Sequence, residues 1–150
     1  AINIQDSARE LHEKELRFSP TAEKELQVLG TALEDILFQA VSSFNQDDPA
    51  AAKAVEPLEE TIDQLTDEIR SRHIRRLQTG ECTIQLGFVL NDLLTNLERV
   101  SDHCSNIAVC VIEERDSSVD HHAYLHRLKV DDNFAEELRE DLSKYRLPNA

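Results

Sequence analysis

Two pairs of carboxylates, each spaced by one helical turn, are the first candidates for a functional site in this chain. Glu98 and Asp102 form one pair, and Glu59 and Asp63 form a second pair upstream. If the two pairs lie on antiparallel neighbouring helices, four acidic groups meet with no lysine between them. Such a cluster is costly unless a cation lies in it. The spacing therefore makes these four residues a candidate metal site.

A site built only from carboxylate oxygens favours hard cations. Mg²⁺, Ca²⁺, Mn²⁺ and ferric iron are the ions that such ligands bind, and bridging carboxylates can support more than one ion. The alternative is a solvated acidic face, because acidic pairs at this spacing are common on helices. Both interpretations place the carboxylates beside the apolar stripes of their helices and away from the main core.

Three segments carry apolar residues at spacings of three and four, the pattern of amphipathic helices. The first runs from about residue 20 to 45 behind a Ser-Pro cap signal, the second from 49 to 79, and the third from 86 to 111. The third has a heptad seam. The apolar positions of the three segments are Leu26, Leu29, Leu33, Ile36, Ala40 and Phe44; Val55, Leu58, Ile62, Leu65 and Ile69; and Leu86, Leu90, Leu93, Leu97, Val100, Cys104, Ile107 and Val111.

Helices joined by short loops cannot bury such stripes separately, so the sequence predicts an all-α, up-down-up three-helix bundle with short flanking helices. We expect an N-terminal helical lead-in over 1–18, the bundle over 19–115, and short C-terminal helices over 116–150, at about 121–130 and 133–145.

The register of the second and third segments decides whether the carboxylate pairs meet. Glu59 and Asp63 precede Thr79 by about 20 and 16 residues, while Glu98 and Asp102 follow it by about 19 and 23. Antiparallel packing therefore brings the two pairs to within roughly one turn of each other.

Composition excludes several classes of protein. At 150 residues with 40% hydrophobic content, the chain suits one domain. A formal charge of −14 repels phosphate backbones, so we expect no nucleic-acid binding. No stretch has the length and apolarity of a membrane span, and the first residues do not read as a signal peptide. Three cysteines without C-x-x-C spacing indicate reduced thiols and a cytosolic protein.

One basic cluster stands out in this acidic chain. Arg70, Arg72, Arg75 and Arg76 gather at the end of the second predicted helix. Positive charge at a helix C-terminus complements the helix dipole, which is one explanation. The other is contact with lipid headgroups, phosphate or an acidic partner.

His122 and His126 are four residues apart, a spacing that can chelate zinc or nickel. With no third ligand evident, the alternative is a chance surface pair. No catalytic motif accompanies these sites, since the three main helices lack Glu-x-x-His and the chain lacks Gly-x-Ser-x-Gly and glycine-rich phosphate loops. We therefore expect a protein that is not an enzyme.

Four short stretches resemble, in order and spacing, one three-helix repeat of the PhoU family, whose members regulate phosphate uptake. They are Leu29-Gly30, Asn45-Gln46-Asp47, Glu59-x-x-Ile62-Asp63 and Leu97-Glu98-Arg99-Val100-Ser101-Asp102. The resemblance covers about residues 21–114. The stretch from Asp102 to Ala108 is similar to the PhoU-like cytoplasmic C-terminal domain of bacterial Na⁺/phosphate cotransporter-family proteins.

This resemblance implies a regulatory domain at the inner face of a membrane that docks on a transporter domain of the same or a partner protein. It implies that Glu59, Asp63, Glu98 and Asp102 are metal ligands. Full-length PhoU proteins have two such bundles, so a single bundle implies a homodimer, and Ser101 stands where the motif usually has glycine. The alternative of a different class is a self-associating helical scaffold without metal function.

Overall fold

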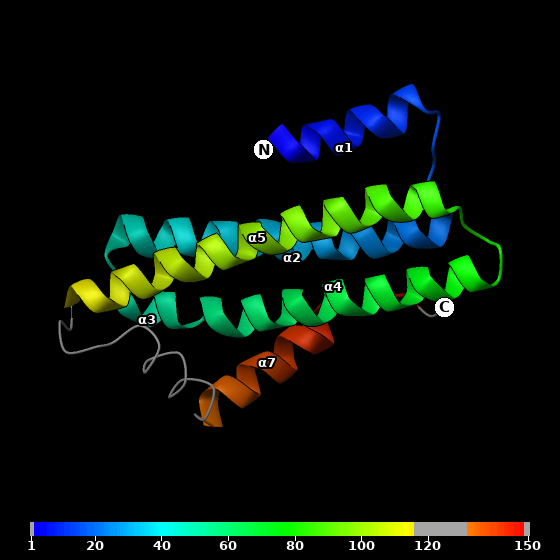
Figure 1. The fold of residues 1–150 in the computed structure, drawn as a ribbon. Helices are drawn as coiled ribbons and strands as arrows, with labels where there is room; N and C mark the ends of the chain where they lie inside the picture. The colour runs from blue at the N-terminus through cyan, green and yellow to red at the C-terminus, as the bar shows by residue number, and fades with distance from the viewer. Residues whose placement is uncertain (1, 116–131, 149–150) are drawn as a thin grey trace.

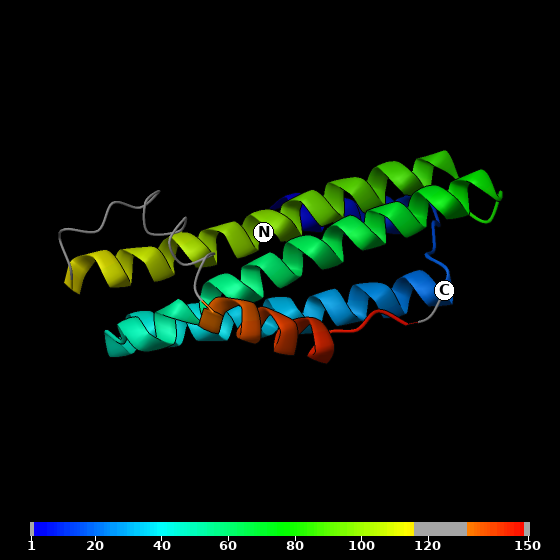
Figure 2. The ribbon, with the colours of Figure 1, turned by 90° about the horizontal axis from the view of Figure 1, so that it is seen from below.

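The computed structural model describes residues 2–115 and 132–148, and these residues form helices joined by short turns, with no strand among them. Three long helices, α2 (Pro20–Gln46), α4 (Val55–Gln78) and α5 (Ile84–Arg115), run side by side in alternating directions (Figures 1 and 2). The predicted all-α, up-down-up bundle is confirmed.

The first long helix has the cap signals that the sequence suggested. The hydroxyl Oγ of Ser19 accepts a hydrogen bond from the amide of Ala22 at 3.2 Å, and Pro20 occupies the first turn. At the other end Asp47 adopts a left-handed conformation with φ 49°, and the next amide, of Asp48, donates to the carbonyl of Ser43 at 3.0 Å. The chain thus reverses directly after α2.

The second predicted helix is broken, which corrects the prediction of one helix from residue 49. A short helix, α3 (Pro49–Lys53), ends at Ala54, and α4 begins at Val55. Pro57 explains the break, because a proline has no amide hydrogen and its ring clashes with the carbonyl four residues earlier, here that of Lys53. At the far end Gly80 has φ 78°, which turns the chain from α4 towards α5.

The buried face of α5 is rotated from the predicted seam. Leu94 and Ala108 are buried, whereas Leu93 is only half-buried and Ile107 is 38% exposed. The difference is one residue at three successive heptads, where Leu94, Ser101 and Ala108 are buried in place of Leu93, Val100 and Ile107. The buried face is therefore turned around the helix by a constant angle, with the seven-residue spacing kept. The buried positions of α5 are Leu86, Val89, Leu90, Leu94, Ser101, Cys104, Ser105, Ala108, Val109, Val111 and Ile112, with Leu97 partly buried.

One residue of the apolar face predicted for the first long helix also lies outside the core. Phe44 is exposed, and the polar residue Glu25 takes a fully buried position nearer the start of the helix. The remaining core comes from all three long helices, from Ala52 of α3 and from Tyr145 near the C-terminus.

Two flanking helices cover the bundle. Helix α1 (Ile2–Glu13) packs on α5, where the side chain of Asn3 donates to that of Asn96 at 2.9 Å, and α7 (Asp132–Lys144) packs on α4 (Figure 1). Tyr145 follows α7 and is buried in the core cluster. The predicted helix at 121–130 lies outside the described residues. Among those residues, no helix is both long and apolar enough to cross a membrane.

Candidate metal centre

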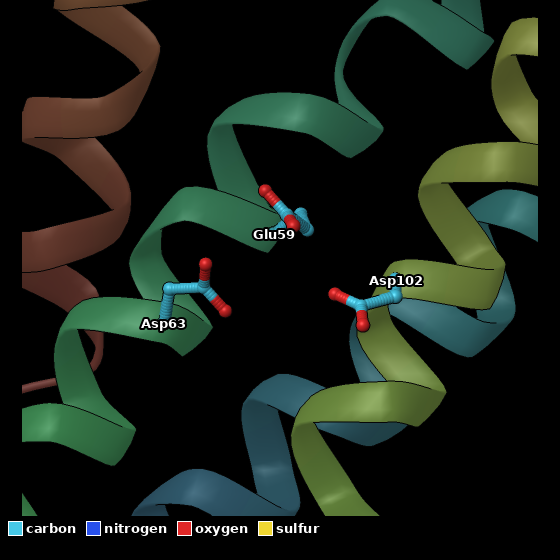
Figure 3. Close-up of side chains that lie close together, drawn as sticks. All are labelled: Glu59, Asp63 and Asp102. Carbon is cyan, nitrogen blue, oxygen red and sulfur yellow. The ribbon is translucent and has the colours of Figure 1, made fainter. Parts of the chain in front are cut away.

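Three of the four predicted carboxylates converge between α4 and α5. Glu59 and Asp63 of α4 and Asp102 of α5 each offer an oxygen atom, and these oxygens lie within 4.8 Å of one another. The three side chains point towards a common space (Figure 3). Glu59 and Asp63 are half-buried and Asp102 is exposed. The cluster therefore opens to solvent on the α5 side.

Core packing explains why these side chains face each other. Leu58 and Ile62 are fully buried, and each is followed by a member of the cluster, Glu59 and Asp63. A step of one residue turns a side chain by about 100° around a helix, which brings it from the core to the edge of the helix interface. On α5 the fully buried Ser101 places Asp102 in the same way.

The donor set fits a hard cation. Three carboxylates from two helices supply only oxygen ligands, which Mg²⁺, Mn²⁺, Ca²⁺ and iron accept. Ionised carboxylates this close repel one another, and a bound cation relieves that repulsion. The half-burial of Glu59 and Asp63 strengthens both effects, because water screens buried charges less well.

Glu98 is not brought into this cluster. Its Oε2 atom accepts from Nη2 of Arg70 at 2.9 Å, and Nη1 of the same arginine donates to Asp67, also at 2.9 Å. The turn of α4 that faces Glu98 therefore presents a guanidinium group. The sequence spacing correctly predicted the position of Glu98 along the helix axis. It did not predict that the long side chain of Arg70 would reach and pair with it.

The other arginines of the basic cluster also have carboxylate partners within the chain. Both oxygens of Glu25 accept from Arg76, at 2.8 and 3.1 Å, and Arg72 donates to the same carboxylate at 3.4 Å. Arg72 and Arg75 donate to Glu68 at 2.8 and 3.3 Å. The predicted contact with an external anion or lipid would therefore compete with internal ion pairs.

Glu25 was missed by sequence reasoning, although one signal could have found it. It precedes Leu29 by four residues and Ala32 by seven, which is the spacing of the buried face of α2. An acidic residue on such a face needs a basic partner. The arginines near the end of the second predicted helix were the available candidates.

The predicted histidine pair and a third histidine, His73, lie in different parts of the chain. His122 and His126 lie outside the residues that the structure describes. His73 of α4 is buried, and both of its ring nitrogens lie 3.7 Å from Sγ of Cys82. Burial lowers the pKa of His73, and the nearby charge of Arg76 lowers it further. His73 is therefore a neutral core residue at neutral pH.

Comparison with known proteins identifies the bundle. The model of the PhoU domain matches residues 26–111, which is more than half of the chain and includes all three cluster carboxylates. The chain belongs to the PhoU family. The resemblance to the PhoU family is thus confirmed. The PhoU domain matched here leaves α1 and α7 outside its limits.

A curated relative gives the scale of the match. The chain is 26% identical over 112 residues to the phosphate-specific transport system accessory protein PhoU homolog 1 of Thermotoga maritima, which covers 75% of this chain and 47% of that protein. The chain therefore spans about half the length of this PhoU relative. No solved structure matches it.

Proposed function

We propose that this PhoU domain is a non-catalytic regulator of phosphate uptake. The relative from Thermotoga maritima is named an accessory protein of phosphate-specific transport, which supports this role. The finer proposal is that the chain is the cytoplasmic part of a Na⁺/phosphate cotransporter-like membrane protein. Its partner would be the transporter domain, in the same or a partner protein, at the inner face of the membrane.

The observation that carries a regulatory mechanism is the convergence of Glu59, Asp63 and Asp102. These residues would hold a cation, with iron, magnesium, manganese and calcium as the candidates. The ion would supply positive charge between the three carboxylates and so link α4 to α5. Occupancy would then change the surface that the transporter domain meets.

Metal analysis tests this mechanism. Protein purified without chelator is measured by inductively coupled plasma mass spectrometry beside the variant Glu59→Gln/Asp63→Asn/Asp102→Asn. We expect stoichiometric metal in the first and none in the second. The matched controls are Glu98→Gln, which changes the Arg70 ion pair, and Asp92→Asn on an exposed turn of α5. Equal metal in the triple variant and the wild type contradicts the site.

Phosphate uptake tests the regulatory role. Cells that express the full-length protein containing this chain are compared with cells that carry the triple variant. We expect altered uptake of labelled phosphate in the variant at equal protein level, and unaltered uptake in the Asp92→Asn control. Uptake that does not differ between wild type and variant contradicts metal-dependent regulation.

We include self-association to a homodimer in this proposal. A second copy would cover apolar side chains of α2 and α5 that remain exposed. A self-associating scaffold without metal function is the second candidate. It is favoured by large apolar side chains that remain exposed on α2 and α5. A scaffold should keep its size and melting temperature in chelator, whereas a metal-organised regulator should not.

A further inference from the structure

Two stretches without charge expose large apolar side chains, although 31% of the chain is charged. Residues 36–46 and 82–91 contain no Asp, Glu, Lys or Arg. The first stretch, in α2, has one exposed face that we term the α2 stripe: Leu37, Phe38, Val41 and Phe44. Phe38 and Phe44 are 73% and 62% exposed. Apolar faces of this kind on an acidic protein mark interaction surfaces.

The second stretch forms one wall of a groove between α4 and α5, next to the loop that joins them. We term it the hairpin groove. Ile74 and Leu77 line it from α4, and Ile84 and Phe88 line it from α5, around a volume of about 310 Å³. Phe88 is 69% exposed. A hollow of this size and apolar character suits a few inserted side chains.

The charges of α4 differ between the two ends of the bundle. Residues 55–68 contain six carboxylates and no Lys or Arg, whereas residues 69–78 contain four arginines and no Asp or Glu. The hairpin groove lies at the arginine end. Since Glu25 near the start of α2 meets Arg76, and the two helices are antiparallel, the α2 stripe lies towards the carboxylate end.

We propose that the α2 stripe of one copy of this chain packs into the hairpin groove of another copy. Two molecules with a net charge of −14 repel each other in most orientations, but this one brings an acidic end against a basic end. The stripe is uncharged, and the groove is lined mostly by apolar side chains, with Arg70 and His73 beside them. The aromatic side chains of the stripe are anchors that can fill such a hollow. The contact joins two different surfaces, so a homodimer with two-fold symmetry would make it twice, with the stripe of each copy in the groove of the other. It gives a location to the self-association in the proposed function and rests on that part alone.

Complementary variants test this contact. Phe38→Asp places a charge in the stripe and leaves the groove unchanged. Phe88→Asp places a charge in the groove and leaves the stripe unchanged. We expect the wild type to associate with rising concentration in sedimentation and light scattering, and each variant alone to remain monomeric. An equimolar mixture of the two variants should form a 1:1 complex, because each supplies the surface that the other lacks. Ile2→Asp on α1 is the control, since Ile2 is equally exposed and belongs to neither surface.

Three results would overturn the proposal. The wild type could stay monomeric at all concentrations, the mixture could fail to associate, or Phe88→Asp alone could associate as well as the wild type, which would indicate stripe-to-stripe pairing. Circular dichroism checks that each variant is folded, which we expect because both phenylalanines are exposed. Metal content measured on the same samples keeps this outcome separate from that of the metal site.

Discussion

The carboxylate of Glu25 and the guanidinium of Arg76 form a two-pronged ion pair across the interface of α2 and α4, with hydrogen bonds of 2.8 and 3.1 Å. Glu25 is fully buried, so water does not compensate its carboxylate. This pair and the weaker third contact from Arg72 do so instead. A buried charge that loses its partner is strongly destabilising, because neither water nor protein then compensates it.

Arg76→Ala should therefore lower the free energy of unfolding by about 3 kcal/mol. Urea denaturation followed by circular dichroism measures the loss. The control is Arg75→Ala, since Arg75 is largely exposed and, among the residues that the structure describes, pairs with Glu68. We expect a change within about 0.5 kcal/mol. Equal midpoints for the two variants would show that the Glu25 pair is not the stabilising contact described here.

Tyr145, the residue after α7, should contribute to the free energy of unfolding mainly through the burial of its aromatic ring. Tyr145 is buried in the core cluster, and its hydroxyl donates to Asp35 of α2 at 2.5 Å. Tyr145→Phe should cost about 1 kcal/mol of unfolding free energy, the net value of a hydrogen bond, and Tyr145→Ala about 3 to 4 kcal/mol. Denaturant titration of both variants separates the two parts. A phenylalanine variant as unstable as the alanine variant would assign the effect to the hydroxyl instead.

Metal binding should raise the melting temperature. A ligand that binds only the folded state at about 100 times its dissociation constant stabilises by about 2.7 kcal/mol. We expect Mn²⁺ to produce such a shift in the wild type and in Glu98→Gln, and excess chelator to reverse it. Asp102→Asn should show little or no shift, because only two of the three converging carboxylates remain. Differential scanning calorimetry at fixed ionic strength is the measurement, and an undiminished shift in Asp102→Asn would contradict the three-residue site.

Stability should fall below neutral pH because of His73. Burial holds the pKa of His73 below its ordinary value of 6.5, so the unfolded chain binds a proton more readily than the folded protein does. The stability is complete above pH 6.5 and decreases as pH falls towards the folded pKa, by at most about 1.4 kcal/mol per pH unit. Denaturation at pH 7.5 and 5.5 should show this loss in the wild type and less of it in His73→Gln. Equal losses in both proteins would assign the effect to other groups.

The sequence predicts the three long helices well because their apolar spacing and their caps at Ser19 and Gly80 are local signals. It predicts less well which face of α5 is buried. Leu93 and Leu94 are adjacent, as are Ile107 and Ala108, so two neighbouring stripes have nearly the same apolar content. Packing against α2 and α4 selects between them, and that choice is made by contacts distant in sequence.

The candidate site shows the same limit. Register along antiparallel helices placed Glu59, Asp63 and Asp102 at one level, which the structure brings together. Glu98 pairs with Arg70 of α4 instead of joining the cluster. Arg72 and Arg76 pair with the buried carboxylate of Glu25 in α2. Helical spacing gives the level of a residue, whereas the partner of a long charged side chain depends on the whole packed structure.

The position of Asp102 far from the α4–α5 turn has a mechanical consequence. Asp102 lies 18 residues beyond Ile84, where α5 begins, which along a helix is about 27 Å. A tilt of α5 by about 2° around that turn would move the carboxylate of Asp102 by roughly 1 Å relative to α4. This displacement is larger than the range of metal–oxygen distances that a divalent cation accepts. The retention of a metal ion by the three carboxylates would therefore depend on the angle between α4 and α5.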